Sequence, residues 1–350
     1  MADPGISRAR LSPRLPSRRT ALKTGLAMGL SAFLFPTLSA CTTEDRPRTA
    51  TVAGGEPGGF YLEFSTLFAE SLQRHGVVGT AVPQVTGGSL ENMQRLIAGD
   101  ATFAVALADA AAQQAGVSPP QAGASKAAQP GAGGIVALGK VYENYVHCLV
   151  RKDSSLRSFA DLAGKTAAIG EVGSGTSLTA HRVIAAAGLS AAGTTPPHNP
   201  VKELNLGLNS GLAALKERSV DALFWSGGVP TAAITATNKE VGLAMIDLSA
   251  VIRQMRAEYG AFYDRVLIPE NSYEGIPGVW TVGVANLLLC RGDLDDRIVK
   301  RTVELLVDEA QELIPRSSLG VQFLSPETLI NTAGVPLHPA AAAAYRELHG

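Results

Sequence analysis

Four short stretches rich in glycine and hydroxyl residues could hold a small polar ligand. They cover residues 54–61, 86–89, 173–177 and 226–229, and each follows an apolar run typical of a strand. A strand that turns on glycine into a helix leaves the first N–H groups of that helix without partners, and such groups bind phosphate, carboxylate or neutral oxygen atoms. Together, the four turns predict a binding site built from backbone N–H and hydroxyl donors, with Tyr61 or Trp225 as an apolar wall.

Other chemistries fit these turns poorly. No turn contains the lysine of Gly-x-x-x-x-Gly-Lys-[Ser/Thr], which a triphosphate site needs. None reads Gly-x-Gly-x-x-Gly with an acidic residue about 20 positions later, as a dinucleotide site does. Residues 173–177 read Gly-Ser-Gly-Thr-Ser, which is not the order of the hydrolase elbow Gly-x-Ser-x-Gly.

Two carboxylates, Glu56 and Glu171, lie within or beside these turns and could act as a general acid and base. The chain places no nucleophile, base or metal-ligand set beside them: it has no Cys-x-x-Cys or His–Cys cluster, and the lone strand histidine His147 is expected to be structural. We therefore expect no catalysis, no metal and no cofactor. Glu56 and Glu171 are expected to face solvent or the ammonium group of a ligand.

Alternating strand and helix patterns surround the turns. Strand-like runs begin near residues 49, 80 and 101, and the runs between them have apolar residues at helical spacing, with Ser89 expected to cap the second helix. Alternation of this kind predicts an α/β sheet that binds ligands at the carboxyl ends of its strands. The Ala-, Gly- and Pro-rich run at 115–134 has no period and is expected to be a surface insertion.

Two segments resemble each other: the strand at 145–151 and a later one near residue 290 both continue as basic-x-Asp and then a helix. They suit two strands that cross between the lobes of a hinged protein. Aligning them places Cys148 and Cys290 two positions apart on equivalent strands, hence on the same face. The sequence leaves open a disulfide between them or two separately buried thiols.

Composition indicates a folded protein, because 46% of the 350 residues are hydrophobic and 17% are charged. Six basic residues and one acidic residue precede Cys41, so the rest of the chain keeps 24 of 30 basic residues against 30 of 31 acidic ones, a net charge of −6. A nucleic-acid site would be basic and clustered, so nucleic acid is not expected as a partner.

The N-terminus is typical of an export signal. Arg18 and Arg19 resemble a twin-arginine motif, although Ala21 stands where that motif usually has Phe, and about 16 apolar residues follow, fewer than the roughly 20 that a membrane span needs. Leu-Ser-Ala-Cys at 38–41 resembles a lipobox. We therefore predict a signal peptide over 1–40, a lipid on Cys41 and a polar tether over 41–48.

With these motifs in place, the chain resembles the TAXI family, the extracytoplasmic solute-binding proteins of one class of TRAP transporters. The resemblance runs from about Thr51 to Tyr345. It is carried by an ordered set of motifs: AGGEPGGFYLEF, VTGGSLENMQRLIAGDATFAVALAD, LVRKDSSLRSFADLAGK, GSGTSLTAHRV, VDALFWSGGVPTAAI, YGAFYDRVLIPENSYEG, LLCRGDLDDRIV and VPLHPAAAAAYRE.

The resemblance implies a two-lobed type II periplasmic-binding-protein fold, in which each lobe is a sheet flanked by helices and hinge strands join the lobes. It implies lobe I at 49–145, lobe II at 146–284 and a return to lobe I at 285–350. The protein would be a membrane-anchored lipoprotein on the periplasmic side. It would capture a small polar or carboxylate-containing solute, an amino acid such as glutamate or glutamine or an organic acid, and deliver it to the membrane subunits of a TRAP transporter.

By motif, the resemblance assigns ligand-binding residues to both lobes. Those of lobe I are Gly59, Phe60, Tyr61, Thr86, Gly87, Gly88, Ser89 and Asn92. Those of lobe II are Gly173, Ser174, Gly175, Thr176, Ser177, Ser226, Gly227 and Gly228, with Trp225 beside them.

The sequence departs from the family pattern at Glu56-Pro57, at Glu171 and at Trp225. Two added negative charges near the mouth of the site would disfavour a dicarboxylate by Coulomb repulsion. The solute stays open, and so does a second function: the same fold could sense a ligand for a signalling partner.

Overall fold

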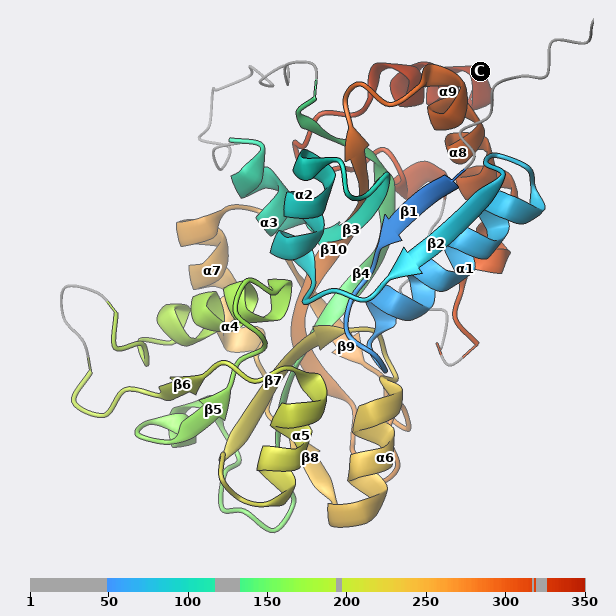
Figure 1. Ribbon diagram of the computed structural model, residues 1–350. Coiled ribbons are helices and arrows are strands. Elements are labelled where there is room, and N and C mark those ends of the chain that lie inside the picture. The colour runs from blue at the N-terminus through green and yellow to red at the C-terminus, as the bar shows by residue number, and fades with distance from the viewer. Residues whose placement is uncertain (1–48, 117–132, 193–196, 317, 319–325, 350) are drawn as a thin grey trace, which may run out of the picture. The chain divides into compact units, whose positions relative to one another are not determined.

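The computed structural model describes residues 49–116, 133–192, 197–316, 318 and 326–349 (Figure 1). The chain separates into two units, Met1–Asp45 and Arg46–Gly350, and the first lies outside the described residues. The predicted signal peptide, Cys41, the tether at 41–48 and most of the insertion at 115–134 therefore also lie outside them. Among the described helices, none has the length and apolar character that crossing a membrane requires.

Within the described residues, ten strands form one mixed sheet with helices against it (Figure 1). The main path runs β2-β1-β3-β10-β4-β7-β5-β6, while β8 pairs with β4 and β9 with β10. The strands are β1 Thr49–Ala53, β2 Thr80–Gln84, β3 Phe103–Leu107, β4 Ile135–Arg151, β5 Thr166–Ala168, β6 Lys202–Leu204, β7 Ala222–Gly227, β8 Leu243–Met245, β9 Tyr263–Ile268 and β10 Val279–Arg291.

The sheet has two halves, each with parallel strands. The first half contains β1, β2 and β3, and the second contains β5, β6 and β7. The helices are α1 Phe60–Arg74, α2 Ser89–Ala98, α3 Ala108–Gln114, α4 Gly175–Ala186, α5 Leu208–Lys216, α6 Ala232–Val241, α7 Ile252–Tyr259, α8 Asp296–Asp308 and α9 Pro339–His349. Short 3-10 turns cover Phe159–Leu162, Ser249–Val251, Ala310–Leu313 and Pro326–Thr328.

Two long strands join the halves. β4 has 17 residues and β10 has 13, and they pair antiparallel from Tyr145 opposite Gly283 to Ile135 opposite Arg291. β10 also pairs with β3 of the first half, and β4 with β7 of the second. The two resembling segments are thus crossing strands, as the sequence predicted. The predicted lobe boundaries fall inside these strands and stay predictions.

Of the two alternatives that the sequence left open for Cys148 and Cys290, the structure has the two separately buried thiols. Cys290 lies opposite Val136, whereas Cys148 is twelve residues further along β4. At about 3.3 Å per residue, roughly 40 Å of strand separate them. Because β4 and β10 run antiparallel, two residues at matching places in their sequences lie at opposite ends of the strand pair. The similarity of the two segments therefore does not place the thiols near each other.

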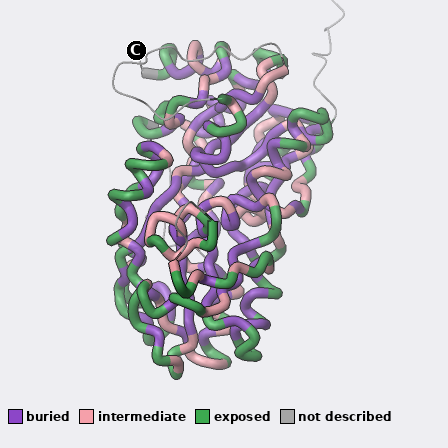
Figure 2. The backbone as a smooth tube through the Cα atoms, turned by 90° about the vertical axis from the view of Figure 1, so that its left-hand side faces the viewer, coloured by how far each residue is buried: buried purple, intermediate pink, exposed green. Residues whose placement is uncertain are grey.

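Apolar spacing explains how the helices pack. Phe60, Phe64, Phe68 and Leu72 recur every four residues on α1 and are all buried, which places one face of the helix in the core. One buried cluster joins both halves, since it contains residues of β1 and β3 together with residues of β5 and β7. Buried segments accordingly run through both halves of the sheet (Figure 2).

Candidate ligand-binding site

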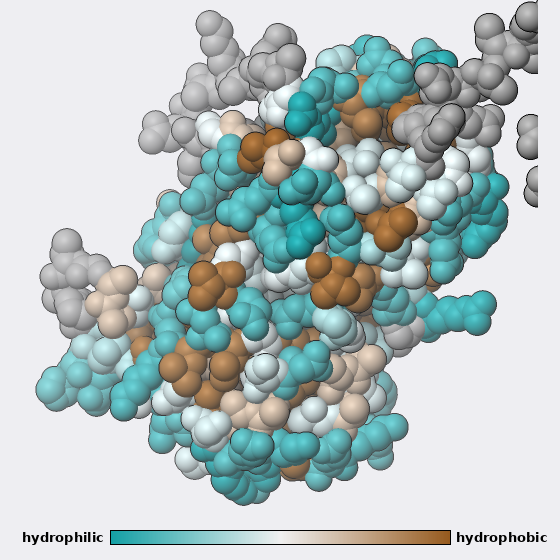
Figure 3. Space-filling model, viewed as in Figure 1, coloured by the Kyte–Doolittle hydropathy of each residue, from teal (hydrophilic) through white to brown (hydrophobic). Residues whose placement is uncertain are grey.

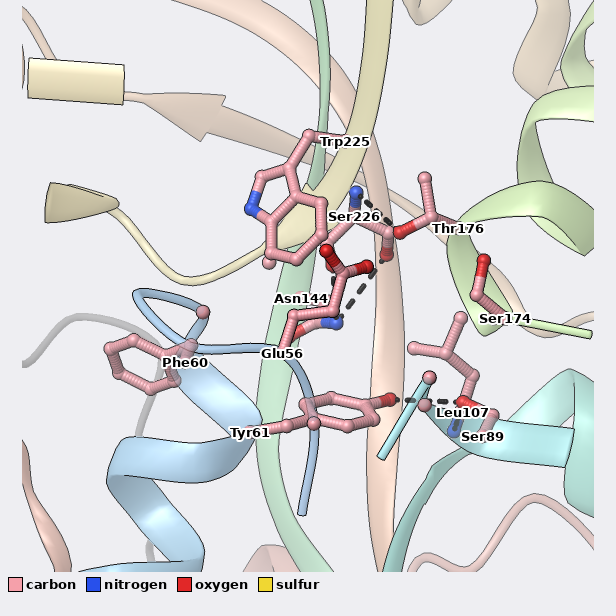
Figure 4. A pocket seen from close by; sticks show the side chains of 16 residues that line it. Glu56, Phe60, Tyr61, Ser89, Leu107, Asn144, Ser174, Thr176, Trp225 and Ser226 are labelled. Atoms are coloured by element: carbon pink, nitrogen blue, oxygen red, sulfur yellow. Dashed lines mark hydrogen bonds between the residues drawn. The ribbon is translucent and has the colours of Figure 1, made fainter. Parts of the chain in front are cut away.

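A cavity of about 30 Å³ lies where the two halves meet (Figure 4). Its walls come from the turns after β1 and β2, the start of α4 and the end of β7. The lining residues are Gly55, Glu56, Gly59, Phe60, Tyr61, Gly87, Gly88, Ser89, Leu107, Asn144, Ser174, Gly175, Thr176, Trp225, Ser226 and Gly227. All four predicted glycine turns therefore reach one cavity.

Twelve of the seventeen predicted site residues line this cavity. The other five, Thr86, Asn92, Gly173, Ser177 and Gly228, do not line it, and their role in ligand binding stays a prediction. Gly55, Leu107 and Asn144 were missed. Glu56, which the sequence placed either in solvent or beside a ligand, lines the cavity.

Thr86 and Asn92 hold the turns of the first half in place. The Thr86 hydroxyl lies 2.6 Å from Asn92 Oδ1, and Asn92 Nδ2 donates to the carbonyls of Gly54 at 2.6 Å and Val105 at 2.8 Å. Both side chains are buried. Their polar atoms are thus engaged with the protein, and they position the turns instead of facing a ligand.

Ser89 is the first residue of α2, and Gly88, with φ of 113°, takes the capping position expected for Ser89. The Ser89 hydroxyl instead accepts from Leu107 N–H at 3.1 Å and lies 3.2 Å from the Tyr61 hydroxyl. Tyr61 donates to Asn286 Oδ1 at 2.5 Å, and burial raises the pKa of Tyr61, which keeps its hydroxyl neutral. This wall of the cavity is uncharged.

Hydroxyl groups also organise the second half. Ser174 caps α4 by accepting from Ser177 N–H at 3.0 Å, and Thr176 Oγ1 accepts from Ser226 N–H at 3.2 Å. Asn144 Nδ2 donates to the Ser226 carbonyl at 3.1 Å. Asn144 Oδ1 is buried and has no hydrogen-bond partner among the described residues. Asn144 lies within the long strand β4, and nothing local in its sequence marks it as a site residue.

Trp225 forms an apolar wall. Its Nε1 donates to Thr231 Oγ1 at 3.2 Å, so its polar atom is satisfied within the second half. A Cβ atom at Gly59 would lie 3.3 Å from Cζ2 and Cη2 of the indole. Gly59 therefore lets the first half approach the benzene ring of Trp225 closely, and Figure 4 shows the Trp225 side chain in the wall of the cavity.

Direct contacts hold the two halves together around the cavity. Leu90 N–H of α2 donates to the Gly173 carbonyl at 3.2 Å. Arg182 of α4 pairs with Asp109 of α3 at 2.8 Å, and Tyr263 donates to the same carboxylate at 2.9 Å. The Asp109 side chain is fully buried. The structure is thus a closed arrangement of the two halves.

Glu56 extends from the first half to α5 in the second. Its Oε2 accepts from Leu208 N–H at 2.9 Å, while Glu171 Oε1 accepts from Gly207 N–H at 3.2 Å. Burial raises the pKa of Glu56, and the negative charge of Glu171 raises it further. Two carboxylates therefore share the N-terminus of α5 at the edge of the cavity.

His147 is structural, as the sequence predicted. It is fully buried, with Nδ1 2.9 Å from the Tyr145 carbonyl and Nε2 2.9 Å from the Tyr273 hydroxyl. Burial lowers the pKa of His147 to about 4. The ring is therefore neutral near pH 7.

One group of described residues, His75, Glu309 and Glu312, is close enough to share a metal ion. It lies beyond the C-terminal end of α1, whereas the cavity touches its first two residues, about 20 Å away along the helix. Arg74 already pairs with Glu312 at 2.5 Å. This group gives the cavity no metal.

Two half-sheets joined by crossing strands, with helix N-termini from both halves at one cavity, define the type II periplasmic-binding-protein fold. The chain belongs to the NMT1-like family, whose sequence model matches residues 52–348. A solved structure from Bordetella bronchiseptica RB50 shares this fold at 13% identity, covering 87% of this chain and 98% of that one with a TM-score of 0.50.

Two further solved structures are similar to this chain at lower TM-scores. The periplasmic aliphatic sulphonate binding protein SsuA from Escherichia coli is 14% identical, with 86% of this chain and 79% of that one covered and a TM-score of 0.43. The GluR0 ligand-binding core from Nostoc punctiforme in complex with L-glutamate is 15% identical, with 75% and 96% covered and a TM-score of 0.43.

Proposed function

We propose that this protein is an extracytoplasmic receptor that captures a small polar solute and delivers it to the membrane subunits of a TRAP-type transporter, without catalysing a reaction. The observation that carries the proposal is the meeting of two helix N-termini, of α2 and α4, from opposite halves at one cavity. Helix N-termini bind anionic and polar groups through free N–H donors. Membership in the NMT1-like family supports the receptor class.

The size of the cavity supports closure around the solute. Its 30 Å³ holds two or three water molecules, whereas pockets for small ligands measure about 300–1,000 Å³. A solute therefore needs the halves to separate before it enters. The crossing strands β4 and β10 are the only regular strands shared by the two halves within the described chain, so opening would bend them.

The transporter partner is supported by the resemblance to the TAXI motifs and by apolar side chains at the mouth. Val85 and Val172 are 57% and 79% exposed, and they precede the turns at 86–89 and 173–177 on opposite halves. Apolar side chains also stand among hydrophilic ones on the face of the molecule that Figure 3 shows. A partner over the mouth would contact both halves. Export and a lipid on Cys41 would hold the receptor at the membrane.

A thermal-shift screen of small polar metabolites tests the receptor. A solute that binds only the native state adds about 2.7 kcal/mol at a hundred times its Kd. We expect one amino acid or carboxylate to raise the Tm, and the double variant Ser174→Ala, Thr176→Ala to abolish that rise. Ser158→Ala, which removes a capping hydroxyl that does not line the cavity, is the control. Absence of any shift across amino acids, carboxylates and amines contradicts the receptor.

A further inference from the structure

Two carboxylates and no cation lie at the described edge of the cavity. A Cβ atom at Gly207 would lie 2.5 Å from Glu56 Oε2 and 2.9 Å from Glu171 Oε1, so these two oxygens are within about 5.4 Å of each other. Within the described chain, neither carboxylate has an ion-pair partner, and no Lys, Arg or His lines the cavity. Backbone N–H groups at the start of α5 are hydrogen-bonded to both carboxylates, but no cationic side chain of the described residues balances their charge.

The hydrogen bond from α5 occupies only part of the acceptor capacity of the Glu56 carboxylate. Oε2 accepts from Leu208 N–H at 2.9 Å, but a carboxylate has about four lone-pair sites over its two oxygens. Glu56 also lines the cavity, which Glu171 does not. This half-buried carboxylate thus keeps acceptor capacity beside the space where a solute would lie (Figure 4).

A second acceptor belongs to a residue that lines the same cavity. Asn144 is 1% exposed and lines the cavity, and its Oδ1 has no hydrogen-bond partner in the part of the chain that the structure describes. Its Nδ2 is already fixed by the Ser226 carbonyl at 3.1 Å, which orients the amide. Buried polar atoms without partners are rare, and such an atom in a cavity points to a missing donor. Trp225, with its ring against the same space, attracts cations through its π face.

Donors gather at the opposite wall. The backbone N–H groups of Gly175 and Thr176 lie in the first turn of α4, where no intrahelical acceptor exists. Gly88, before α2, is so close that a Cβ atom there would lie 3.8 Å from Gly175 N. This wall suits one anionic group, whereas the Glu56 wall suits a donor.

We propose that the solute carries a protonated amine, held by Glu56 and Asn144 Oδ1, and no more than one carboxylate, held at the N-termini of α2 and α4. The proposal rests on the receptor function and narrows its ligand. A dicarboxylate would place its second negative group against Glu56 and Glu171. Burial and the negative charge of Glu171 raise the pKa of Glu56, and a bound ammonium group would oppose both effects.

Isothermal titration calorimetry with a charge series tests the proposal on the purified protein. Glycine and γ-aminobutyrate carry one amine and one carboxylate, putrescine carries only amines, and succinate and glutarate carry only carboxylates. We expect a compound with both groups to bind at least tenfold more tightly than either dicarboxylate. A dicarboxylate that binds as tightly overturns the proposal while leaving the receptor intact.

Matched variants separate ligand contact from helix capping. Glu56→Gln and Glu171→Gln each remove one charge from the N-terminus of α5, but only Glu56 lines the cavity. We expect Glu56→Gln to weaken binding of the amine-bearing compound about tenfold or more, and Glu171→Gln less than threefold. Equal effects of both variants, or none from Glu56→Gln, contradict the proposal. Because the charge series uses the unmodified protein, it stands even where a variant does not fold.

Discussion

The variant Gly175→Ala should hinder closure of the two halves without destabilising the fold of either half. Gly175 begins α4 in the second half, and its backbone adopts a conformation that alanine also adopts. An added Cβ atom would lie 2.5 Å from Ser89 Oγ and 2.7 Å from Leu107 Cδ1, both of the first half. The collision therefore exists only while the halves are together.

The expected cost follows from these distances. Real Cβ contacts are essentially never shorter than 3.0 Å, so the halves must separate by about half an ångström. Ser89 and Leu107 are fully buried and hydrogen-bonded to each other, so neither moves easily. Overpacking of this kind costs about 1–3 kcal/mol, which corresponds to roughly 5- to 150-fold weaker ligand binding. In the open arrangement the alanine instead favours the helix by up to about 1 kcal/mol.

Calorimetry with the solute from the screen, together with thermal denaturation without it, measures both effects. We expect weaker binding with an unchanged or slightly raised Tm of the free protein. Gly278→Ala is the control, because its Cβ atom would meet only ordinary contacts, the nearest at 3.4 Å. Binding as tight as that of the unmodified protein would refute the closed arrangement as the ligand-bound one.

Two further predictions concern stability. Asp109→Asn leaves the mostly buried charge of Arg182 without its carboxylate partner. We expect urea denaturation to show that the free energy of unfolding falls by about 3–5 kcal/mol. Asp153→Asn, in an exposed ion pair, is the control, and a loss at Asp109 no larger than the loss at Asp153 contradicts this prediction. Burial lowers the pKa of His147 to about 4, below the 6.5 of the unfolded chain. Between these two pH values the unfolded chain therefore binds a proton that the folded chain does not. The free energy of unfolding is expected to fall by about 3 kcal/mol as the pH drops from 6.5 to 4. A His147→Gln variant whose Tm has the same pH dependence as the unmodified protein would argue against that assignment.

The sequence predicts the glycine turns well because their signal is local. Gly88 at φ of 113° and Gly173 at φ of 78° occupy backbone conformations that glycine favours, and turns of this kind precede α2 and α4. Their shared position at one sheet edge follows from the parallel order of the strands around them. Glycine and hydroxyl residues at such turns can therefore be recognised from the order of residues along the chain.

Residues that depend on tertiary pairing are not visible in this way. Asn144 reaches the cavity because β4 pairs with β7 near Ser226, and nothing in the segment around it encodes that neighbour. The strand predicted at 145–151 in fact begins ten residues earlier, at Ile135. The sequence hides this start because Lys140 and Glu143 interrupt the apolar pattern, although both pair with β10. The direction of pairing, which separates Cys148 from Cys290, is equally hidden.

The crossing strands also decide how the described chain loses its structure. β4 and β10 belong to both halves, and one buried cluster contains side chains of β1, β3, β5 and β7. Each half also has a buried cluster of its own, but the shared strands and the shared cluster tie the two together. Unfolding of residues 49–349 is therefore expected to be cooperative, as a single transition. Stabilisation from a solute bound at the junction would then be shared by the whole sheet, including strands that never touch it.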